Sequence, residues 1–361
     1  MHRVHEGTAG LKHAIVPDIE KKHLVRSLLG RTEAGVFITL IVLTAFLTLQ
    51  SSQFATSQNL AFTSRAFSFV AIAAIGEGLI IISGGLDLSV GSVMGLSGVV
   101  AAWFGTHGYG TGPAIAAGLG VGLAVGFTNG VLIAKLNLNP FIVTLAMLNI
   151  VRSLVYVLTH GYPLVGLPGN LTNLGQATVG GVPLPVIIML VVGALFTWLM
   201  RATVFGWRTF AIGGSAEGAR LAGVRVDAMK IALYTIGGLL AALGGVLLTA
   251  RLGVGDSTIG IGYELSVIAS CIIGGVSLYG GIGGVIGILL GAALIGVLQN
   301  GLVILGVTTF WQQFALGMVI LLAVIIDRVR TGTARPNWAL RLRLPGHDRS
   351  ESTEKPAEGG G

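Results

Sequence analysis

Ten runs of apolar residues, separated by polar or Gly/Pro-rich stretches, dominate the chain between residues 34 and 326. Only 10% of all residues are charged, whereas a soluble domain carries about 25%, so this chain cannot cover a water-soluble globule with polar surface. A membrane-crossing helix needs about 20 apolar residues. The pattern predicts an all-α, polytopic membrane protein with about ten spans and excludes soluble-enzyme, secreted and disordered classes. The predicted spans are about 34–50, 67–82, 90–105, 113–134, 141–158, 184–200, 231–250, 265–279, 283–304 and 312–326.

Lysine and arginine indicate how these spans are oriented. Six of them lie in residues 1–33, five in 201–230 and seven in 328–361, which is 18 of the 22 in the chain. Ten spans place these three segments on one side, and the positive-inside rule assigns that side to the cytoplasm. Both termini and the 201–230 loop are therefore predicted to be cytoplasmic, and the long 159–183 connection is predicted to face outward.

The same reading divides the chain into three parts. A transmembrane domain over 34–327 lies between two cytoplasmic tails, and the C-terminal tail has a composition typical of disorder.

Four basic residues fall outside the three basic segments. Lys135 falls on the cytoplasmic side, Arg65 and Arg251 fall on the outer side, and Arg152 falls within the fifth span.

Glycines recur at helical spacing in two of the predicted spans. In a bilayer, small residues four apart let helix backbones approach closely, so we expect these ridges to be helix-packing surfaces. The alternative is that glycine simply fills membrane helices. The ridges consist of Gly118, Gly122, Gly126 and Gly130, and of Gly283, Gly287 and Gly291.

A polar segment, Ile82-Ser-Gly-Gly-Leu-Asp-Leu-Ser-Val-Gly-Ser92, separates two apolar runs. Irregular backbone at membrane depth persists only where protein or a water-filled cavity satisfies it. Asp87 either caps the following helix and shapes the turn, or takes part in a conduit or gate with Ser89. Glu77 lies further inside an apolar run. It either takes part in a pathway or pairs with another group, or it is buried in its protonated form. The different predicted depths of Glu77 and Asp87 argue against a hydrolase with two facing carboxylates.

A second stretch, Gly274-Gly-Val-Ser-Leu-Tyr-Gly-Gly281, has the same pattern of residue types. Both stretches fit Gly-Gly-x-polar-Leu-x-x-Gly between apolar runs, which aligns Gly84 with Gly274 and Asp87 with Ser277. Transporters are often built from two related halves. The match predicts two pseudo-repeated halves here.

The 201–230 loop contains the signals of a short helix. Ser215 is a good N-cap residue, Glu217 falls in the first turn, Arg220 lies near the end, and Gly223 follows as a terminator. A two-turn helix is too short to be stable alone, so we expect it to dock into a groove of a partner protein. The alternative is a solvated basic loop that lies against lipid headgroups.

Several chemistries are absent from the sequence pattern. No Walker-type phosphate loop occurs, so no nucleotide site is predicted in this chain. The seven histidines lie outside the apolar runs with no metal-ligand spacing, and the single cysteine, Cys271, rules out a disulfide framework. The net charge of +7 follows the predicted cytoplasmic side, so it does not indicate nucleic-acid binding.

The chain resembles a known family, the permease subunits of bacterial ABC importers of the ribose/xylose/arabinose type. The similarity extends from about residue 35 to 330. In the cytoplasmic loop, Glu217-Gly-Ala-x-x-x-Gly223 is similar to the family's Glu-Ala-Ala-x-x-x-Gly signature, with Gly218 in place of alanine. The other motifs are Ser83–Ser92, Pro140–Met147, Gly262–Ser270, Ile273–Gly281, Gln299–Gly301 and Trp311–Gln313.

The resemblance implies a subunit that works only in an assembly. Two permeases, as a homodimer or heterodimer, would surround a path for a monosaccharide or related polyol across the bacterial inner membrane. A cytoplasmic ATP-binding-cassette ATPase would bind ATP and Mg, and an extracytoplasmic sugar-binding protein would deliver the solute. No cofactor and no enzymatic activity are expected in this chain, and its other contacts are with membrane lipid. The implied ATPase-coupling residues are Ser215, Glu217, Gly218, Ala219, Arg220 and Gly223, and the candidate path or gate residues are Glu77, Asp87, Ser89 and Asn300.

A different function remains open on the residues alone. A proton-coupled secondary transporter of a small polar solute would use Glu77 or Asp87 as the proton carrier and would need no partner. Glu77 also departs from the uncharged residue that the resemblance implies at that position. The sequence does not identify the solute.

Overall fold

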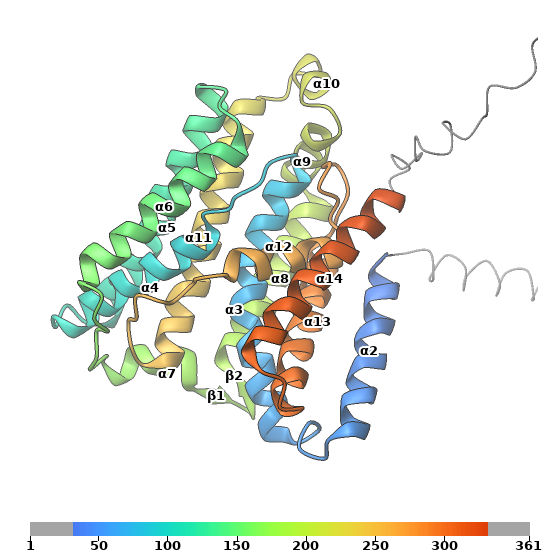
Figure 1. Cartoon of the computed structure of the whole chain (residues 1–361). Coiled ribbons are helices and arrows are strands. Elements are labelled where there is room, and N and C mark those ends of the chain that lie inside the picture. Colours follow the sequence, from blue (N-terminus) through green and yellow to red (C-terminus); the bar gives the residue numbers. More distant parts are fainter. Residues whose placement is uncertain (1–31, 331–361) are drawn as a thin grey trace, which may run out of the picture.

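The structure is a computed structural model that describes residues 32–330. Within this range the chain forms thirteen helices and one small sheet (Figure 1). The helices are α2 (Thr32–Gln50), α3 (Ser57–Ile82), α4 (Val90–Thr106), α5 (Thr111–Lys135), α6 (Pro140–Thr159), α7 (Gly169–Gln176), α8 (Leu184–Ala202), α9 (Val204–Gly214), α10 (Ala216–Leu221), α11 (Val226–Leu252), α12 (Tyr263–Ile273), α13 (Val285–Ile304) and α14 (Thr309–Arg330).

Each predicted span corresponds to one apolar helix. Seven helices are long and apolar enough to cross a bilayer, namely α2, α3, α5, α6, α8, α11 and α13. Three shorter apolar helices, α4, α12 and α14, account for the remaining runs. The prediction of an all-α polytopic membrane protein is therefore confirmed.

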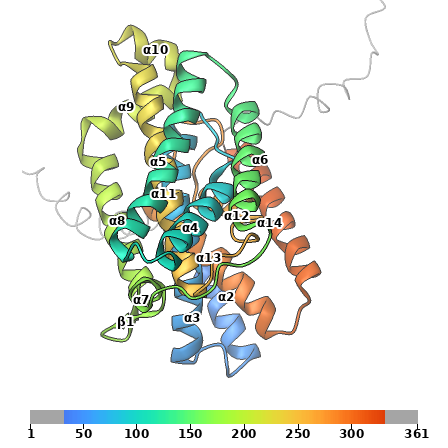
Figure 2. The ribbon, with the colours of Figure 1, turned by 90° about the vertical axis from the view of Figure 1, so that its left-hand side faces the viewer.

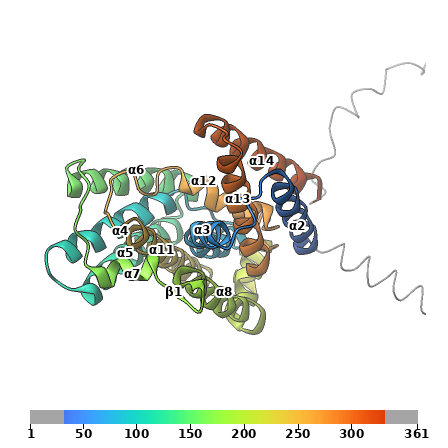
Figure 3. The same cartoon turned by 90° about the horizontal axis from the view of Figure 1, so that it is seen from below.

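Helices α3 and α11 form the interior of the molecule. In their most apolar stretches 78% and 67% of the residues are buried, compared with 11% for α2. Figure 3 shows α3 in the middle of the bundle and α2 at its edge. The outer helices instead expose large apolar side chains such as Ile142 and Val191, as expected for surfaces in contact with lipid.

The connections are divided between two ends of the bundle. The first described residue, the end of α14 and the α9–α10 segment lie at one end, and α7 with the β-strands lies at the other (Figures 1 and 2). Strands β1 (Thr178–Val179) and β2 (Val182–Pro183) form an antiparallel hairpin. This arrangement agrees with an even number of membrane crossings. The assignment of the α10 end to the cytoplasm remains a prediction from the charge pattern.

Several boundaries differ from those predicted. The 159–183 and 201–230 connections contain α7 and α9, which the apolar runs did not reveal. Helix α12 ends at Ile273, not near 279, because a left-handed glycine follows it. The predicted tails lie outside the described residues, apart from their inner ends, which belong to α2 and α14.

Candidate functional site

Two glycine-rich turns meet at the α10 end of the bundle. One connects α3 to α4 over residues 83–89, and the other connects α12 to α13 over 274–284. The Gly281 amide donates a hydrogen bond of 2.8 Å to the Ile82 carbonyl oxygen, so the turns are joined directly. Gly213 of α9 packs on the same spot, where an added Cβ would overlap Ile82 O. Three segments far apart in sequence therefore converge.

Both turns end their helices in the same way. After α3, Gly84 is left-handed (φ +82°), its amide donates to Ile81 O, and the next amide donates to Ile80 O. After α12, Gly275 (φ +87°) and the residue that follows it make the equivalent pair of bonds. This is the Schellman ending of a helix. The geometry thus pairs Gly84 with Gly275, one residue away from the sequence alignment with Gly274.

At equivalent positions, three residues after these glycines, a backbone amide donates a hydrogen bond to a carboxylate. The Asp87 amide donates to Glu77 Oε1 at 3.0 Å. The Leu278 amide donates to Asp327 Oδ2 at 3.4 Å, and the Ser277 hydroxyl donates to the same oxygen at 3.3 Å. Each turn is therefore fixed by an acid from a helix, α3 in one case and α14 in the other.

The Asp87 carboxylate organises its own turn rather than capping α4. Asp87 Oδ1 accepts the Ser89 amide at 2.8 Å and the Ser89 hydroxyl at 2.5 Å. Ser89 is the N-cap residue of α4, and its own side chain makes no capping hydrogen bond. From α5, Asn129 Nδ2 donates to Ser89 Oγ at 3.1 Å. Of the two structural roles considered for Asp87, the shaping of the turn is the one observed.

Glu77 and Asp87 are neighbours, so the prediction that they lie at different depths was wrong. The turn folds back over the end of α3, and both side chains are buried. Neither carboxylate has an ion-pair partner within residues 32–330, and Glu77 Oε2 and Asn129 Oδ1 have no hydrogen-bond partner there. The link runs from a side chain to a backbone amide, not between two facing carboxyl groups.

This arrangement predicts different outcomes for two substitutions of Glu77. Glu77→Gln keeps an oxygen for the Asp87 amide and removes one of two adjacent acidic groups, so the melting temperature is expected to be unchanged or higher. Glu77→Ala leaves a buried amide unpaired, which costs about 1–3 kcal/mol. Thermal unfolding of the detergent-solubilised protein measures both, with Glu217→Ala at an exposed site as the control. Equal destabilisation by glutamine and alanine would contradict the assigned hydrogen bond.

Helix α10 forms as its local sequence predicts. The Ser215 hydroxyl accepts the Gly218 amide at 3.0 Å, and Gly223 (φ +82°) ends the helix with its amide bonded to Arg220 O. Only Ala219 is buried, and it anchors the helix to the body of the protein. The remaining predicted coupling residues are exposed, namely Ser215, Glu217, Gly218, Arg220 and Gly223.

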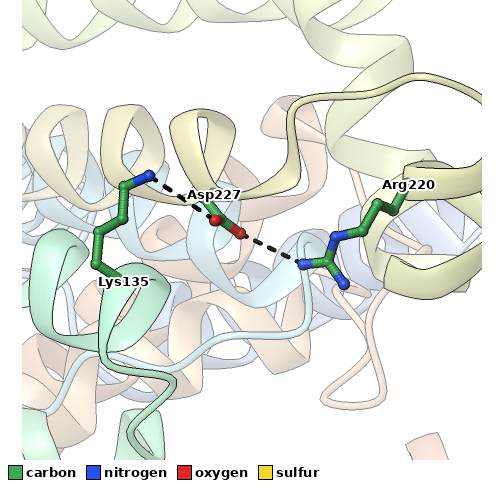
Figure 4. Close-up of polar contacts among 3 residues, drawn as sticks. All are labelled: Lys135, Arg220 and Asp227. Carbon is green, nitrogen blue, oxygen red and sulfur yellow. Dashed lines mark hydrogen bonds and ion pairs between the residues drawn. The ribbon is translucent and has the colours of Figure 1, made fainter.

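Asp227, in the first turn of α11, ties α10 to the transmembrane bundle (Figure 4). Its two carboxylate oxygens lie 3.3 Å from Arg220 Nη2 and 3.9 Å from Lys135 Nζ, which is at the end of α5. The charges suit the helix ends on which they lie, an acid at the start of α11 and a lysine at the end of α5. These side chains are largely exposed, so the bridges position α10 but add little stability.

The first glycine ridge lies against α11. An added Cβ at Gly122, Gly126 or Gly130 would meet α11 backbone, and at Gly118 it would meet the Val246 side chain. The second ridge is shorter than predicted, because Gly283 precedes α13, while Gly287 and Gly291 pack against α12. The approach of α5 to α11 thus depends on the absence of side chains.

Asn300 does not belong to the acidic cluster. It lies near the far end of α13 and forms a reciprocal amide pair with Asn59 of α3, with both N···O distances 3.0 Å. The candidate path residues therefore divide into two groups, Glu77, Asp87 and Ser89 at the α10 end and Asn300 at the other end.

Four residues of these sites were missed by sequence reasoning. Asp227 and Lys135 are separated by 92 positions, so no local signal connects them. Asn129 lies within the predicted glycine ridge, next to Gly130, and was not considered as a polar partner. Leu221 is 85% exposed on α10, which only the helix orientation reveals.

Comparisons with known proteins agree with this architecture. The family described as "Branched-chain amino acid transport system / permease component" matches residues 59–324. The chain is 40% identical to the ribose import permease protein RbsC of Escherichia coli (strain K12) and 38% identical to RbsC of Bacillus subtilis (strain 168), each over 299 residues, 82% of this chain and 93% of the relative. It is 36% identical to the L-arabinose ABC transporter permease protein AraH of Azospirillum brasilense over 302 residues, 84% of this chain and 89% of that protein. No solved structure matches the chain.

Proposed function

The chain belongs to the permease family of branched-chain amino acid transport systems and their relatives, and we infer that it is the membrane subunit of an ABC importer for a monosaccharide or related polyol. The observation that carries this inference is 36–40% identity, over 82% or more of the chain, to permeases named for ribose and L-arabinose. The ten apolar helices agree with a multi-pass protein of the inner (plasma) membrane. Within the family, these relatives favour a sugar over an amino acid as the solute.

Import against a gradient requires an energy source that this chain does not provide. Its sequence has no phosphate-binding loop, so ATP and Mg would be bound by a separate cytoplasmic ATPase. The exposed face of α10, with Glu217 and the apolar Leu221, supports the docking of that subunit. A second permease copy and an extracytoplasmic sugar-binding protein would complete the assembly.

The contacts of α10 suggest how a push on it would reach the membrane helices. Arg220 contacts Asp227, which starts α11, and Asp227 contacts Lys135 at the end of α5. The preceding helix, α9, packs through Gly213 on the two joined turns. Movement of α9–α10 would therefore displace α11 and both turns together. The Glu77–Asp87 turn would act as a gate at this end of the path.

Reconstitution tests the proposal against the proton-coupled alternative. Proteoliposomes that contain this chain, its ATPase and its binding protein are expected to accumulate radiolabelled ribose, arabinose or a related sugar only when ATP is present. Vesicles with this chain alone are expected to accumulate none, with or without a pH gradient. Accumulation driven by a pH gradient in vesicles that hold only this chain would refute the importer assignment.

A further inference from the structure

Arg65 and Arg251, the two basic residues that the charge pattern places on the outer side, belong to α3 and α11, which pack against each other. Arg251 belongs to the last turn of α11, and its guanidinium carbon is 4.7 Å from the Phe62 ring centroid and 5.8 Å from that of Phe69. Phe62, Arg65 and Phe69 share one face of α3, because they are three and four residues apart. The Arg251 guanidinium therefore lies over the face of α3 that carries Arg65.

Neither guanidinium has an acceptor in the described part of the protein. The three ion pairs there involve other residues, and Arg65 Nε is buried without a hydrogen-bond partner. The connection after α11 contains a single acid, Asp256, whose carboxylate accepts the amide and hydroxyl of Thr258 at 2.7 and 2.6 Å. These bonds lower the pKa of Asp256, so it is ionised but engaged locally.

Two guanidinium charges on adjoining helices with no carboxylate partner among the described residues repel each other and cannot remove that repulsion themselves. Arginine stays protonated in proteins, so proton loss does not remove the repulsion. Their positions also oppose the positive-inside distribution of the other basic residues. An anion between the two guanidinium groups would compensate both charges and satisfy their free N–H donors.

From this juxtaposition, we infer that Arg65 and Arg251 form an outward-facing site for one anionic group, a carboxylate or a phosphate. The planar guanidinium fork matches the oxygens of both groups. Phe62 is 54% exposed, so the site opens to its surroundings beside an apolar ring. Gln176 at the end of α7 donates to Arg251 O at 2.9 Å, which places the site at the α7 end of the bundle.

The ligand differs in class from the solutes named for the relatives. Ribose and arabinose are uncharged, whereas this site selects a small solute that carries an acid group, such as a sugar acid or sugar phosphate. The phosphate of an anionic lipid headgroup has the same chemistry. The two sources are separated by presenting the anion in solution or in a bilayer.

The test is anion binding by the purified full-length protein in nonionic detergent. Calorimetric titrations with glucuronate and inorganic phosphate are expected to show binding, and glucose is expected to show none. Arg65→Gln and Arg251→Gln should each weaken anion binding at least about tenfold, since each removes a charge-assisted pair of hydrogen bonds. Arg208→Gln, at an exposed arginine of α9, is the matched control and should bind as the wild type does.

Folding and anion source are checked in parallel. Without anion, the melting temperatures of the two glutamine variants should be no lower than that of the wild type, because the repulsion between the guanidinium groups is relieved. If one variant fails to fold, anion binding is measured with Arg65→Lys, which keeps the charge but loses the planar guanidinium group. Binding of phosphatidylglycerol nanodiscs but not of soluble anions, lost in both variants, would identify a lipid headgroup as the source. The inference is overturned if no anion binds, or if neither variant alters binding. These readouts need neither ATPase nor uptake, so they fail or succeed independently of the importer assignment.

Discussion

Replacing Gly122 with leucine is expected to prevent the bundle from assembling. In the structure Gly122 and Gly238 face each other across α5 and α11, and a Cβ added at either residue would overlap the carbonyl oxygen of the other. Overpacking costs about 1–3 kcal/mol when side chains can move aside. Here the obstacle is helix backbone, so the two helices would have to separate along their contact, and we expect a larger loss.

The measurement is the yield of monodisperse protein in size-exclusion chromatography after detergent extraction, followed by the melting temperature of any folded fraction. Gly120→Leu is the matched control, because Gly120 lies on the same helix, is exposed, and has no atom within 4 Å of its added Cβ. The control should give wild-type yield. A normal yield and melting temperature for Gly122→Leu would show that α5 and α11 do not pack as described.

Features that depend on neighbouring residues were predictable from the sequence. The ten apolar helices follow from runs of residues that lipid can surround. The ends of α10 follow from Ser215 and Gly223, whose side chain and left-handed backbone supply the terminal hydrogen bonds. In both cases the physical cause lies within a few residues of its effect.

Features that depend on how helices come together were not predictable. Glu77 and Asp87 meet because the turn after α3 folds back, and the sequence alone indicates depth only along a straight helix. The two glycine-rich turns were recognised as similar, but their true register needed the backbone conformation of Gly84 and Gly275. The position of Arg251 over the Phe62 and Phe69 rings, beside Arg65 on α3, likewise arises from the packing of α3 against α11.

Replacing Glu217 and Arg220 together with alanine is expected to uncouple ATP hydrolysis from uptake. Both side chains are exposed on α10, and the Arg220–Asp227 bridge joins side chains that are 64% and 42% exposed, so its loss costs about 0–1 kcal/mol of stability. The variant should therefore fold and reach the membrane. Sugar uptake in the reconstituted complex should fall at least about fivefold while ATP hydrolysis continues, because coupling free energies between sites correspond to about 5–150-fold effects.

Asp227→Asn tests whether a movement of α10 is transmitted to α11 and α5. It removes the charge that binds both Arg220 and Lys135 without changing the shape of the side chain, and Asp227 lies outside α10 itself. We expect the ATPase to remain bound, as measured by co-purification, and uptake to fall as it does in Arg220→Ala. Arg208→Ala, which removes an exposed charge from α9, should be neutral. Full uptake in Asp227→Asn together with loss in Arg220→Ala would mean that Arg220 acts by touching the ATPase. Full uptake in the Glu217/Arg220 double variant would remove the coupling role from α10.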